Sequence, residues 1–306
     1  MIIIGYLLIN DTRNKSSIHS DNIFHVNEIS KITKIFLSDR EGNTIELVKD
    51  KYNWIVNKKY TVREDAIKTL LETINKIRIK HPVSNSASEN VIKYIATTGI
   101  NVEIFAEDQL IKSYIIGSST PDHLGTYMII KNTKKPYVIH MPTFNGFLSP
   151  RYGIQNNILN ENSWRSTKVF NLQANKIEQI KYSDLLNPHN SYYLTTKPII
   201  MVLDHNNKEI NYNNKKIQKL LNSFKNLNCE TYKNEKKKLI ESQQVEELIV
   251  NSDTLKIYQI SNSIVKKKNE NYTVKRKFAT LNDGDIMLIQ DYVFNKVLIK
   301  LDEIKN

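Results

Sequence analysis

Two segments far apart in the chain carry apolar residues with the same helical spacing. In each, the apolar positions fall at offsets of 0, 3, 4, 7 and 10 residues. The first set is Ile67, Leu70, Leu71, Ile74 and Ile77, and the second is Ile217, Leu220, Leu221, Phe224 and Leu227. This spacing gathers the side chains on one face of an α-helix. Such a face must leave water, so each segment predicts a helix packed on a larger element.

Strand-like segments rich in β-branched and aromatic residues precede both predicted helices. They lie at 32–38, 44–48 and 54–56 in the first half, and near 177–182, 191–196 and 199–204 in the second. A turn cluster from Asp39 to Asn43 separates the first two segments and predicts a β-hairpin. Thr61 and Glu64 match a capping box, which predicts the start of the first helix.

A second similarity between the halves favours an internal duplication. Phe24, Ile32, Ile35 and Ser38-Asp39 are echoed, with one residue deleted, by Phe170, Ile177, Ile180 and Ser183-Asp184. The alternative is coincidence, because amphipathic helices often use these offsets. Each half then continues with a shorter helix and four strands. One shorter helix is predicted around Val91, Ile92 and Ile95, between a capping box of Ser86 and Glu89 and a C′ residue at Gly99. The other is predicted around Val245, Leu248 and Ile249, and the last strand at 296–301.

Together these patterns predict an α+β fold of two tandem, duplicated units, each a mostly antiparallel sheet with two packed helices. At 306 residues the chain is long enough for two domains with separate cores. The predicted first unit spans residues 21–152 and the second spans 153–306. Residues 1–20 form an apolar N-terminus followed by a polar tether.

The apolar N-terminus, residues 1–9, has three interpretations. It falls well short of the roughly 20 residues that span a bilayer as a helix, and it lacks a basic n-region and a small-residue cleavage site. It is an ordinary first strand, the tail of a membrane anchor whose beginning is missing, or a short end that dips into a membrane.

The formal net charge of +12 indicates nucleic acid or another anionic surface as an alternative partner. The basic residues are 37 Lys and only 7 Arg, however, and bidentate recognition of phosphates and guanines depends mainly on Arg. Lys, Asn and Ile are abundant together, as a biased genome composition would produce. Solvated lysines therefore explain the charge better than nucleic-acid binding does.

Common catalytic and cofactor motifs are absent from the sequence, including G-x-S-x-G, H-E-x-x-H, the P-loop and G-x-G-x-x-G. Cys229 is the only cysteine, which excludes an intramolecular disulfide and a zinc site built on cysteines. We expect no catalytic residue, no metal and no cofactor. A hydrolase built around Asp122 and His123 is the least favoured hypothesis.

Two segments are candidates for contact with a partner. Residues 117–127 form a polar loop rich in hydroxyls, and residues 144–152 combine aromatic side chains with a glycine and a proline. The candidate contact residues are Ser118, Thr120, Asp122, His123 and Tyr127, and Phe144, Asn145, Arg151 and Tyr152. The structural alternative is a long hairpin connection in which Gly117 and Gly125 adopt unusual φ angles and the hydroxyls satisfy backbone groups.

Several blocks of the sequence, in fixed order, resemble one protein family. They lie at 34–44, 54–57, 63–67, 86–92, 120–128, 144–146 and 150–152. The chain is similar to the bacterial domain-of-unknown-function family 4340, best over residues 32–152. The resemblance implies an N-terminal transmembrane helix and a body outside the cytoplasm, often encoded near auxiliary subunits of ABC-type export or gliding systems. It implies no reaction, cofactor or catalytic residue.

The leading hypothesis is therefore an extracytoplasmic binding or scaffold module in the bacterial periplasm, accessory to a membrane complex and not an enzyme. Its expected partners are a membrane protein complex and, through the N-terminus, the membrane itself. The resemblance favours the truncated-anchor interpretation of residues 1–9. Binding to an anionic surface or nucleic acid is the alternative.

Overall fold

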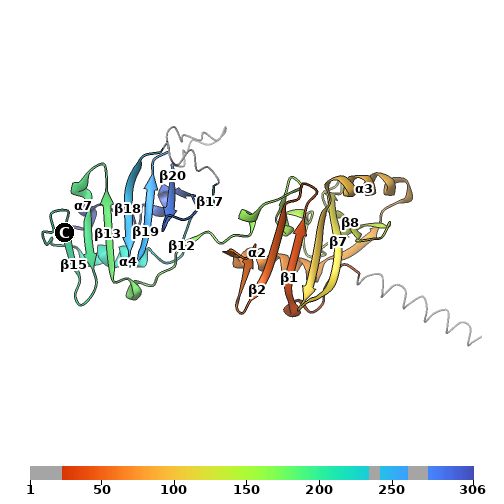
Figure 1. The fold of residues 1–306 in the computed structure, drawn as a ribbon, viewed down its shortest axis with the longest axis horizontal. Coiled ribbons are helices and arrows are strands. Elements are labelled where there is room, and N and C mark those ends of the chain that lie inside the picture. The colour runs from red at the N-terminus through yellow and green to blue at the C-terminus, as the bar shows by residue number, and fades with distance from the viewer. Residues whose placement is uncertain (1–22, 234–241, 261–274) are drawn as a thin grey trace, which may run out of the picture. The chain divides into compact units, whose positions relative to one another are not determined.

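The computed structural model of the protein describes residues 23–233, 242–260 and 275–306. The chain divides into two compact units, and the boundary falls between Ser166 and Thr167 (Figure 1). Each unit has its own hydrophobic core. The N-terminus and tether predicted for residues 1–20 lie outside the described residues. Within the described ranges, no helix is both long and apolar enough to cross a bilayer.

The first unit is built on a nine-stranded sheet in the order β4-β3-β2-β1-β6-β7-β8-β9-β5. Neighbouring strands are antiparallel throughout. The strands are β1 (Ile32–Ser38), β2 (Thr44–Asp50), β3 (Asn53–Val56), β4 (Tyr60–Thr61), β5 (Arg78–Pro82), β6 (Ile100–Ala106), β7 (Gln109–Ser119), β8 (Thr126–Ile130) and β9 (Pro136–His140). A small hairpin of β10 (Ile154–Gln155) and β11 (Ile158–Leu159) follows. The predicted hairpin is confirmed as β1 and β2.

Helix α2 (Glu64–Lys76) covers one face of this sheet (Figure 1). Its predicted stripe is buried at Ile67, Leu70, Ile74 and Ile77, and partly buried at Leu71. Each fully buried aliphatic side chain contributes roughly 1.5–3 kcal/mol, so packing on the sheet stabilises the helix more than local propensity does.

Both predicted capping boxes are wrong. Helix α2 begins after Arg63, while Thr61 belongs to β4 and its carbonyl accepts a hydrogen bond from the Ser166 amide at 2.8 Å. Helix α3 (Asn85–Thr98) begins after Ser84, and neither N-cap residue makes a side-chain capping bond. A cap is worth about 1 kcal/mol, which the pairing of the chain around β4 outweighs.

The second unit is built on an eight-stranded antiparallel sheet in the order β15-β14-β13-β18-β19-β20-β21-β17. The strands are β13 (Gln179–Asp184), β14 (Tyr192–Thr195), β15 (Met201–Asp204), β17 (Thr231–Tyr232), β18 (Gln244–Val250), β19 (Asp253–Tyr258), β20 (Arg276–Leu281) and β21 (Met287–Gln290). Helix α4 (Asn214–Asn222) lies against one face (Figure 1). All five residues of the predicted stripe are buried, but the helix is shorter than predicted: Phe224 lies in the following turn and Leu227 in strand β16 (Leu227–Asn228).

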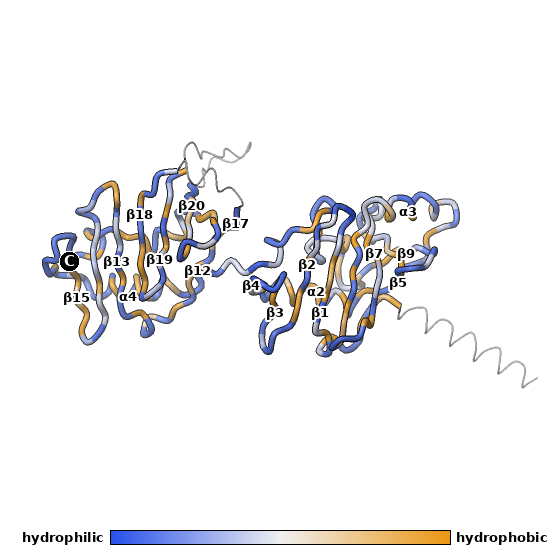
Figure 2. The backbone as a smooth tube through the Cα atoms, viewed as in Figure 1, coloured by the Kyte–Doolittle hydropathy of each residue, from blue (hydrophilic) through white to orange (hydrophobic). Residues whose placement is uncertain are grey.

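Short elements complete the units. In the second, β12 (Lys168–Phe170) pairs with β16 (Leu227–Asn228), and α6 (Asp291–Phe294) and α7 (Leu301–Ile304) close the chain. The 3-10 turns are η1 (Ile29–Lys31), η2 (Ser149–Tyr152), η3 (Glu161–Ser163), η4 (Ala174–Lys176) and η5 (Pro188–Asn190). Hydrophobic residues concentrate in the strands and in α2 and α4, whereas most loops are hydrophilic (Figure 2).

The two large sheets have the same strand order. Apart from β4, the series β3-β2-β1-β6-β7-β8-β9-β5 corresponds one for one to β15-β14-β13-β18-β19-β20-β21-β17. Helices α2 and α4 follow β4 and β15 at matching places in the chain. The common ancestry of the two units stays a prediction, because a shared strand order does not by itself establish descent.

The predicted α+β class, with two packed helices in each unit, is wrong. The structure is mostly antiparallel β-sheet. The segment with Val245, Leu248 and Ile249 is strand β18, and the strand predicted at 296–301 is a turn followed by α7. In α3 only Ile95 is buried, so that helix adds little to the core. Short apolar runs fit a strand or a helix equally well, and the neighbouring strands decided the outcome for β18.

The unit boundary lies beyond the predicted one at Tyr152. Leu159 and Trp164 are buried in the first core. The Arg63 amide donates to the Trp164 carbonyl at 2.7 Å. Residues 153–166 therefore complete the first unit, beyond the boundary predicted after Tyr152.

Candidate functional site

The two segments predicted to contact a partner lie side by side in the first unit. The backbone amide of Leu148 donates to Oγ1 of the buried Thr126 at 2.7 Å. The rings of His123 and Phe147 have centroids 5.8 Å apart. Segments that β8 and β9 separate in the chain therefore form one continuous surface.

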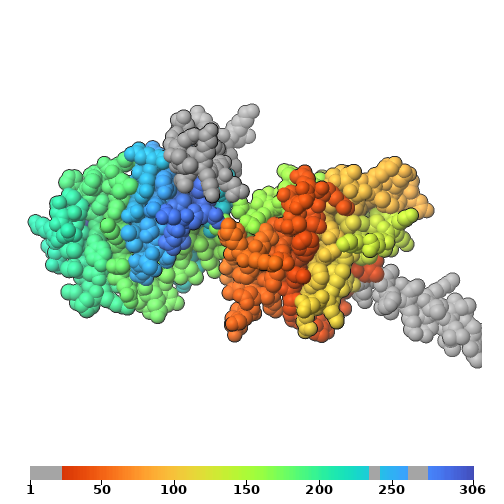
Figure 3. Space-filling model, viewed as in Figure 1, coloured from red at the N-terminus to blue at the C-terminus, as the bar shows by residue number. Residues whose placement is uncertain are grey.

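A groove of about 500 Å³ opens where these segments meet α3. Helix α3 is drawn in light orange in Figure 3. It is lined by Tyr94, Ser118, Ser119, Phe147, Ser149, Pro150, Ile154, Gln155, Asn156 and Asn157. The Asn157 amide donates to the Tyr94 hydroxyl at 3.1 Å. None of these side chains carries a formal charge, although charged residues make up 25% of the chain. The groove offers aromatic surface and neutral hydrogen-bonding groups.

The loop between β7 and β8 is ordered by its own side chains. The hydroxyl of Thr120 donates to Oδ1 of Asp122, and the Leu124 amide donates to the same oxygen at 3.0 Å. The hydrogen bond from Thr120, followed by that from Leu124, lowers the pKa of Asp122. The side chains of Thr120 and Asp122 therefore hold the loop together from within, as expected if it is a structural hairpin connection.

Gly117 and Gly125 provide space and not an unusual backbone angle, so that prediction is wrong. A Cβ atom at Gly117 would lie 2.7 Å from Cγ1 of Ile95, and one at Gly125 would lie 2.6 Å from Cγ1 of Val138. Neither glycine has a positive φ, whereas His123 has φ of 57°. The close approach of the loop to neighbouring elements requires glycine at these positions.

Three of the predicted contact residues belong to the interior or are held by it. Tyr152 is fully buried, and its hydroxyl lies 2.8 Å from that of Tyr114. Thr120 is also buried. The Arg151 guanidinium donates to Oγ1 of Thr73 at 2.7 Å and lies 4.9 Å from the centre of the Phe144 ring. Tyr152 and Thr120 are therefore not accessible for the predicted contacts in this structure, and Arg151 fastens the segment to α2.

The remaining predicted residues lie at least partly on the surface. They are Ser118, Asp122, His123, Tyr127, Phe144 and Asn145. Two further exposed apolar side chains were not among the predicted contact residues: Leu124, with 47% of its surface exposed, and Tyr94, with 40%. A leucine at the tip of a polar loop was the available signal for Leu124. Only the packing of α3 brings Tyr94 to the groove.

Asp122 and His123 do not form a catalytic pair in this geometry. Nδ1 of His123 lies 3.2 Å from the Ser119 hydroxyl, and the carboxylate of Asp122 accepts from Thr120 and Leu124. Neither residue lines the groove. Across residues 23–233, 242–260 and 275–306, no three His, Cys, Asp or Glu side chains gather in a way that could hold a metal ion.

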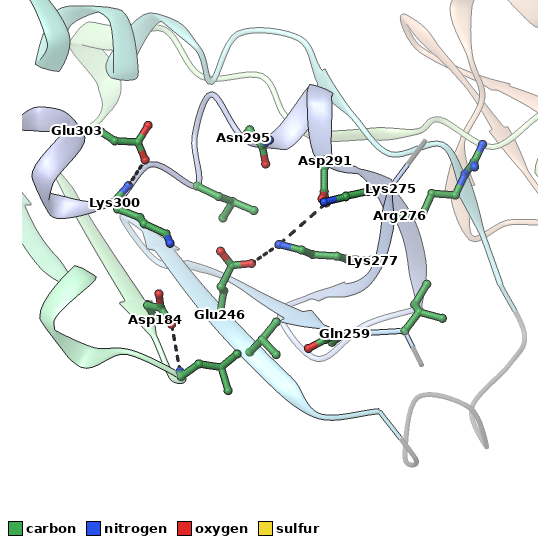
Figure 4. Close-up of a pocket in the computed structure, with 14 residues that line it drawn as sticks. Asp184, Glu246, Gln259, Lys275, Arg276, Lys277, Asp291, Asn295, Lys300 and Glu303 are labelled. Atoms are coloured by element: carbon green, nitrogen blue, oxygen red, sulfur yellow. Dashed lines mark hydrogen bonds and ion pairs between the residues drawn. The ribbon is translucent and has the colours of Figure 1, made fainter. Parts of the chain in front are cut away.

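The second unit contains a larger cleft, of about 780 Å³, that the sequence analysis did not predict (Figure 4). Its lining comes from β18, the end of β19, β20, the loop after β13, and the segment from α6 to α7. The charged lining residues are Asp184, Glu246, Asp291 and Glu303, and Lys275, Arg276, Lys277 and Lys300. Aliphatic side chains complete it at Leu186, Val245, Ile260 and Leu298.

An ion-pair network lies at the centre of the cleft. Nζ of Lys277 lies 2.6 Å from Oε2 of Glu246 and 4.0 Å from Oδ1 of Asp291 (Figure 4). The Tyr182 hydroxyl donates to Oε1 of Glu246 at 2.9 Å. Burial, followed by the charge of Glu246, raises the pKa of Tyr182. Tyr182 therefore acts as a neutral donor that holds Glu246 in place.

Comparison with protein families identifies the chain. A profile described as Domain of unknown function (DUF4340) matches residues 54–244, more than half of the sequence. The chain belongs to the DUF4340 family. No curated protein and no solved structure shows significant similarity to it. The family prediction is confirmed, and the match continues well into the second unit, beyond the 32–152 range of the best predicted resemblance.

The groove and the cleft differ in their relation to the DUF4340 match. Every residue that lines the groove lies within residues 54–244. Of the residues that line the cleft, only Asp184 and Leu186 fall inside this range. The groove therefore belongs to the DUF4340 region, and most of the cleft lies in the part of the chain that follows it.

Proposed function

We propose that this DUF4340 protein is a binding module without a reaction of its own, and that its first unit contacts a protein partner through the groove and the loop between β7 and β8. The convergence of the two predicted segments carries this proposal. Leu148 is hydrogen-bonded to Thr126, and Phe147 packs near His123, so both segments present their exposed side chains on one surface. Contacts of this kind hold loops in place for recognition.

The lining of the groove favours a partner segment without charged side chains. A charged group that entered it would lose hydration without meeting an opposite charge, which is unfavourable. Aromatic and neutral polar groups, such as Tyr94 and the amides at 155–157, suit an uncharged segment with backbone and apolar groups of its own. Leu124 adds an exposed apolar contact in the loop between β7 and β8.

The cellular setting of the proposal rests on the family resemblance. It implies a membrane-held protein whose body lies outside the cytoplasm, near export or gliding systems. We therefore propose an auxiliary subunit of a membrane complex as the partner. Membrane attachment would come from the N-terminal part of the chain, and the two units would provide the body that the complex contacts.

Co-purification from detergent-solubilised membranes tests the proposed function. Two single substitutions, Tyr94→Glu and Leu124→Glu, place a charge in and beside the groove. Each should lower recovery of the same membrane protein, measured by quantitative mass spectrometry, by about tenfold or more, as expected when a hot-spot contact is lost.

Tyr52 supplies the matched control. Its side chain is 96% exposed in the turn between β2 and β3, and it does not line the groove. Tyr52→Glu should leave recovery unchanged. Equal recovery with all three variants, or an equal loss with all three, would rule out the groove as the contact surface.

A further inference from the structure

One charged residue of the cleft, Glu246, stands at a position that corresponds to a hydrophobic core residue of the first unit. Ile35 of β1 is opposite Ile104, and its counterpart Ile180 of β13 is opposite Val250. Ile100 precedes Ile104 by four residues in β6, and Glu246 precedes Val250 by four residues in β18. Ile100 and Glu246 therefore occupy corresponding positions of the two sheets. Ile100 is buried in the first core. The sheet does not need a charge at this position, and a carboxylate there requires partners that an aliphatic side chain does not.

Most charged groups of the cleft already have close partners. Glu246 binds Lys277 and Tyr182. The Asp184 carboxylate accepts from the amides of Leu186 and Asn187, at 3.0 and 2.9 Å. In the same way, Glu303 accepts from the Lys300 amide at 2.8 Å, and Arg276 pairs with Glu230 at 2.6 Å.

Three charged groups keep unused binding capacity. The Asp291 carboxylate has one ion pair, with Lys277, at 4.0 Å. Lys275 and Lys300 line the cleft, and neither ammonium group makes an ion pair with any residue in the described ranges. Figure 4 shows Asp291 and Lys300 coming from different parts of the rim, with Lys277 and Glu246 between them. Lys275 is the neighbour of Asp291, whose amide donates to its carbonyl at 3.0 Å. The opposite parts of the rim therefore offer the Asp291 carboxylate and the Lys300 ammonium group to a ligand.

We propose that this cleft binds a short peptide with free termini and aliphatic side chains. The α-ammonium group of the peptide pairs with Asp291, and its carboxylate pairs with Lys300 at the other part of the rim. The lining has four acidic and four basic residues, so its formal net charge is zero. A ligand without net charge leaves the net charge of the occupied cleft at zero. This proposal does not depend on the groove of the first unit.

The size and the walls of the cleft agree with this ligand. A volume of about 780 Å³ lies within the range of roughly 300–1,000 Å³ that is usual for ligand pockets. Leu186, Val245 and Leu298 provide apolar surface for aliphatic side chains. The fixed pair of Glu246 and Lys277 orients the polar backbone of a peptide through hydrogen bonds.

Isothermal titration of the full chain with the tripeptide Leu-Ala-Leu tests the proposal. Three further forms of the probe are compared with it. The N-acetyl peptide lacks the ammonium charge, the C-terminal amide lacks the carboxylate charge, and the doubly blocked peptide lacks both. Each single block should weaken binding about tenfold, which corresponds to about 1.4 kcal/mol. The doubly blocked form should bind more weakly than either.

Two variants assign the termini. Asp291→Asn should weaken binding of the free peptide about tenfold but leave the affinity for the N-acetyl form unchanged. Lys300→Gln should weaken binding of the free peptide about tenfold and leave that of the amide unchanged. Lys219→Gln removes the same charge from an exposed position of α4 and should have no effect on any form.

The proposal is wrong if the free and blocked peptides bind equally, or if no form binds at about 1 mM. It is also wrong if the effect of a variant does not depend on the matching terminus. Circular dichroism of each variant separates these results from misfolding.

Discussion

At the scale of single residues, burial separates side chains that the sequence makes look alike. Leu70 of α2 lies fully inside the first core, whereas Leu110 of β7 has 52% of its surface exposed. Each is followed directly by another aliphatic residue, Leu71 or Ile111. Only the register of the strand and the orientation of the helix distinguish them.

We predict that Leu70→Ala lowers the free energy of unfolding of the first unit by about 2–5 kcal/mol, because it leaves a cavity against the sheet. Leu110→Ala is the matched control and should change it by less than about 0.5 kcal/mol. Urea denaturation followed by circular dichroism measures both. A loss below about 0.5 kcal/mol for Leu70→Ala would show that the stripe is not buried.

The partly buried ion pair between Arg276 and Glu230 predicts that the stability of the second unit depends on pH. Nε of Arg276 lies 2.6 Å from Oε2 of Glu230, and the Gln290 amide donates to the same oxygen at 2.7 Å. The hydrogen bond from Arg276 is the main cause that lowers the pKa of Glu230, against the opposing effect of partial burial. The contribution to stability is then complete above the unfolded pKa and disappears as the pH falls through the folded pKa.

We therefore expect Glu230→Gln to cost up to about 1 kcal/mol at neutral pH and to cost progressively less at acidic pH. Denaturation of wild type and variant between pH 7 and pH 3 checks this. The same difference at both ends of that range would contradict the lowered pKa.

At the scale of elements, local capping rules gave the wrong helix starts, and the structure uses a different cap. Asn213 is the N-cap of α4, and its side chain accepts from the amides of Lys215 and Lys216, at 3.1 and 3.2 Å. Ser84 is the N-cap of α3, and its side chain makes no capping bond. The residue type at an N-cap position therefore does not by itself show whether its side chain makes a capping hydrogen bond.

We predict that Asn213→Ala destabilises the second unit by about 1 kcal/mol, since two backbone donors lose their acceptor. Ser84→Ala should be close to neutral for the first unit, within about 0.5 kcal/mol. Thermal unfolding monitored by circular dichroism distinguishes the two. A larger cost at Ser84 than at Asn213 would show that the caps are assigned to the wrong residues.

At the scale of the whole molecule, the two cores are separate sets of residues divided at Ser166 and Thr167. We predict that residues 23–166 and 167–306 each fold when expressed alone, as judged by dispersed amide signals in NMR spectra. A fragment that stops at Tyr152 should be much less stable, because it lacks Leu159 and Trp164 of the first core. Equal stability of the fragments that end at 152 and 166 would contradict this boundary.

The sequence by itself determined the main helices α2 and α4, the hairpin of β1 and β2, most of the other strands and the family. Helical stripes and strand alternation are local, so they can be read without knowing what they pack against. The tertiary structure alone decided that Val245 to Val250 form a strand and that Trp164 belongs to the first core. It also decided that the segments around His123 and Phe147 meet, and that Asp291, Lys275 and Lys300 share a cleft. Each of these depends on which distant strands pair, and that choice minimises the free energy of the whole unit and not of any one segment.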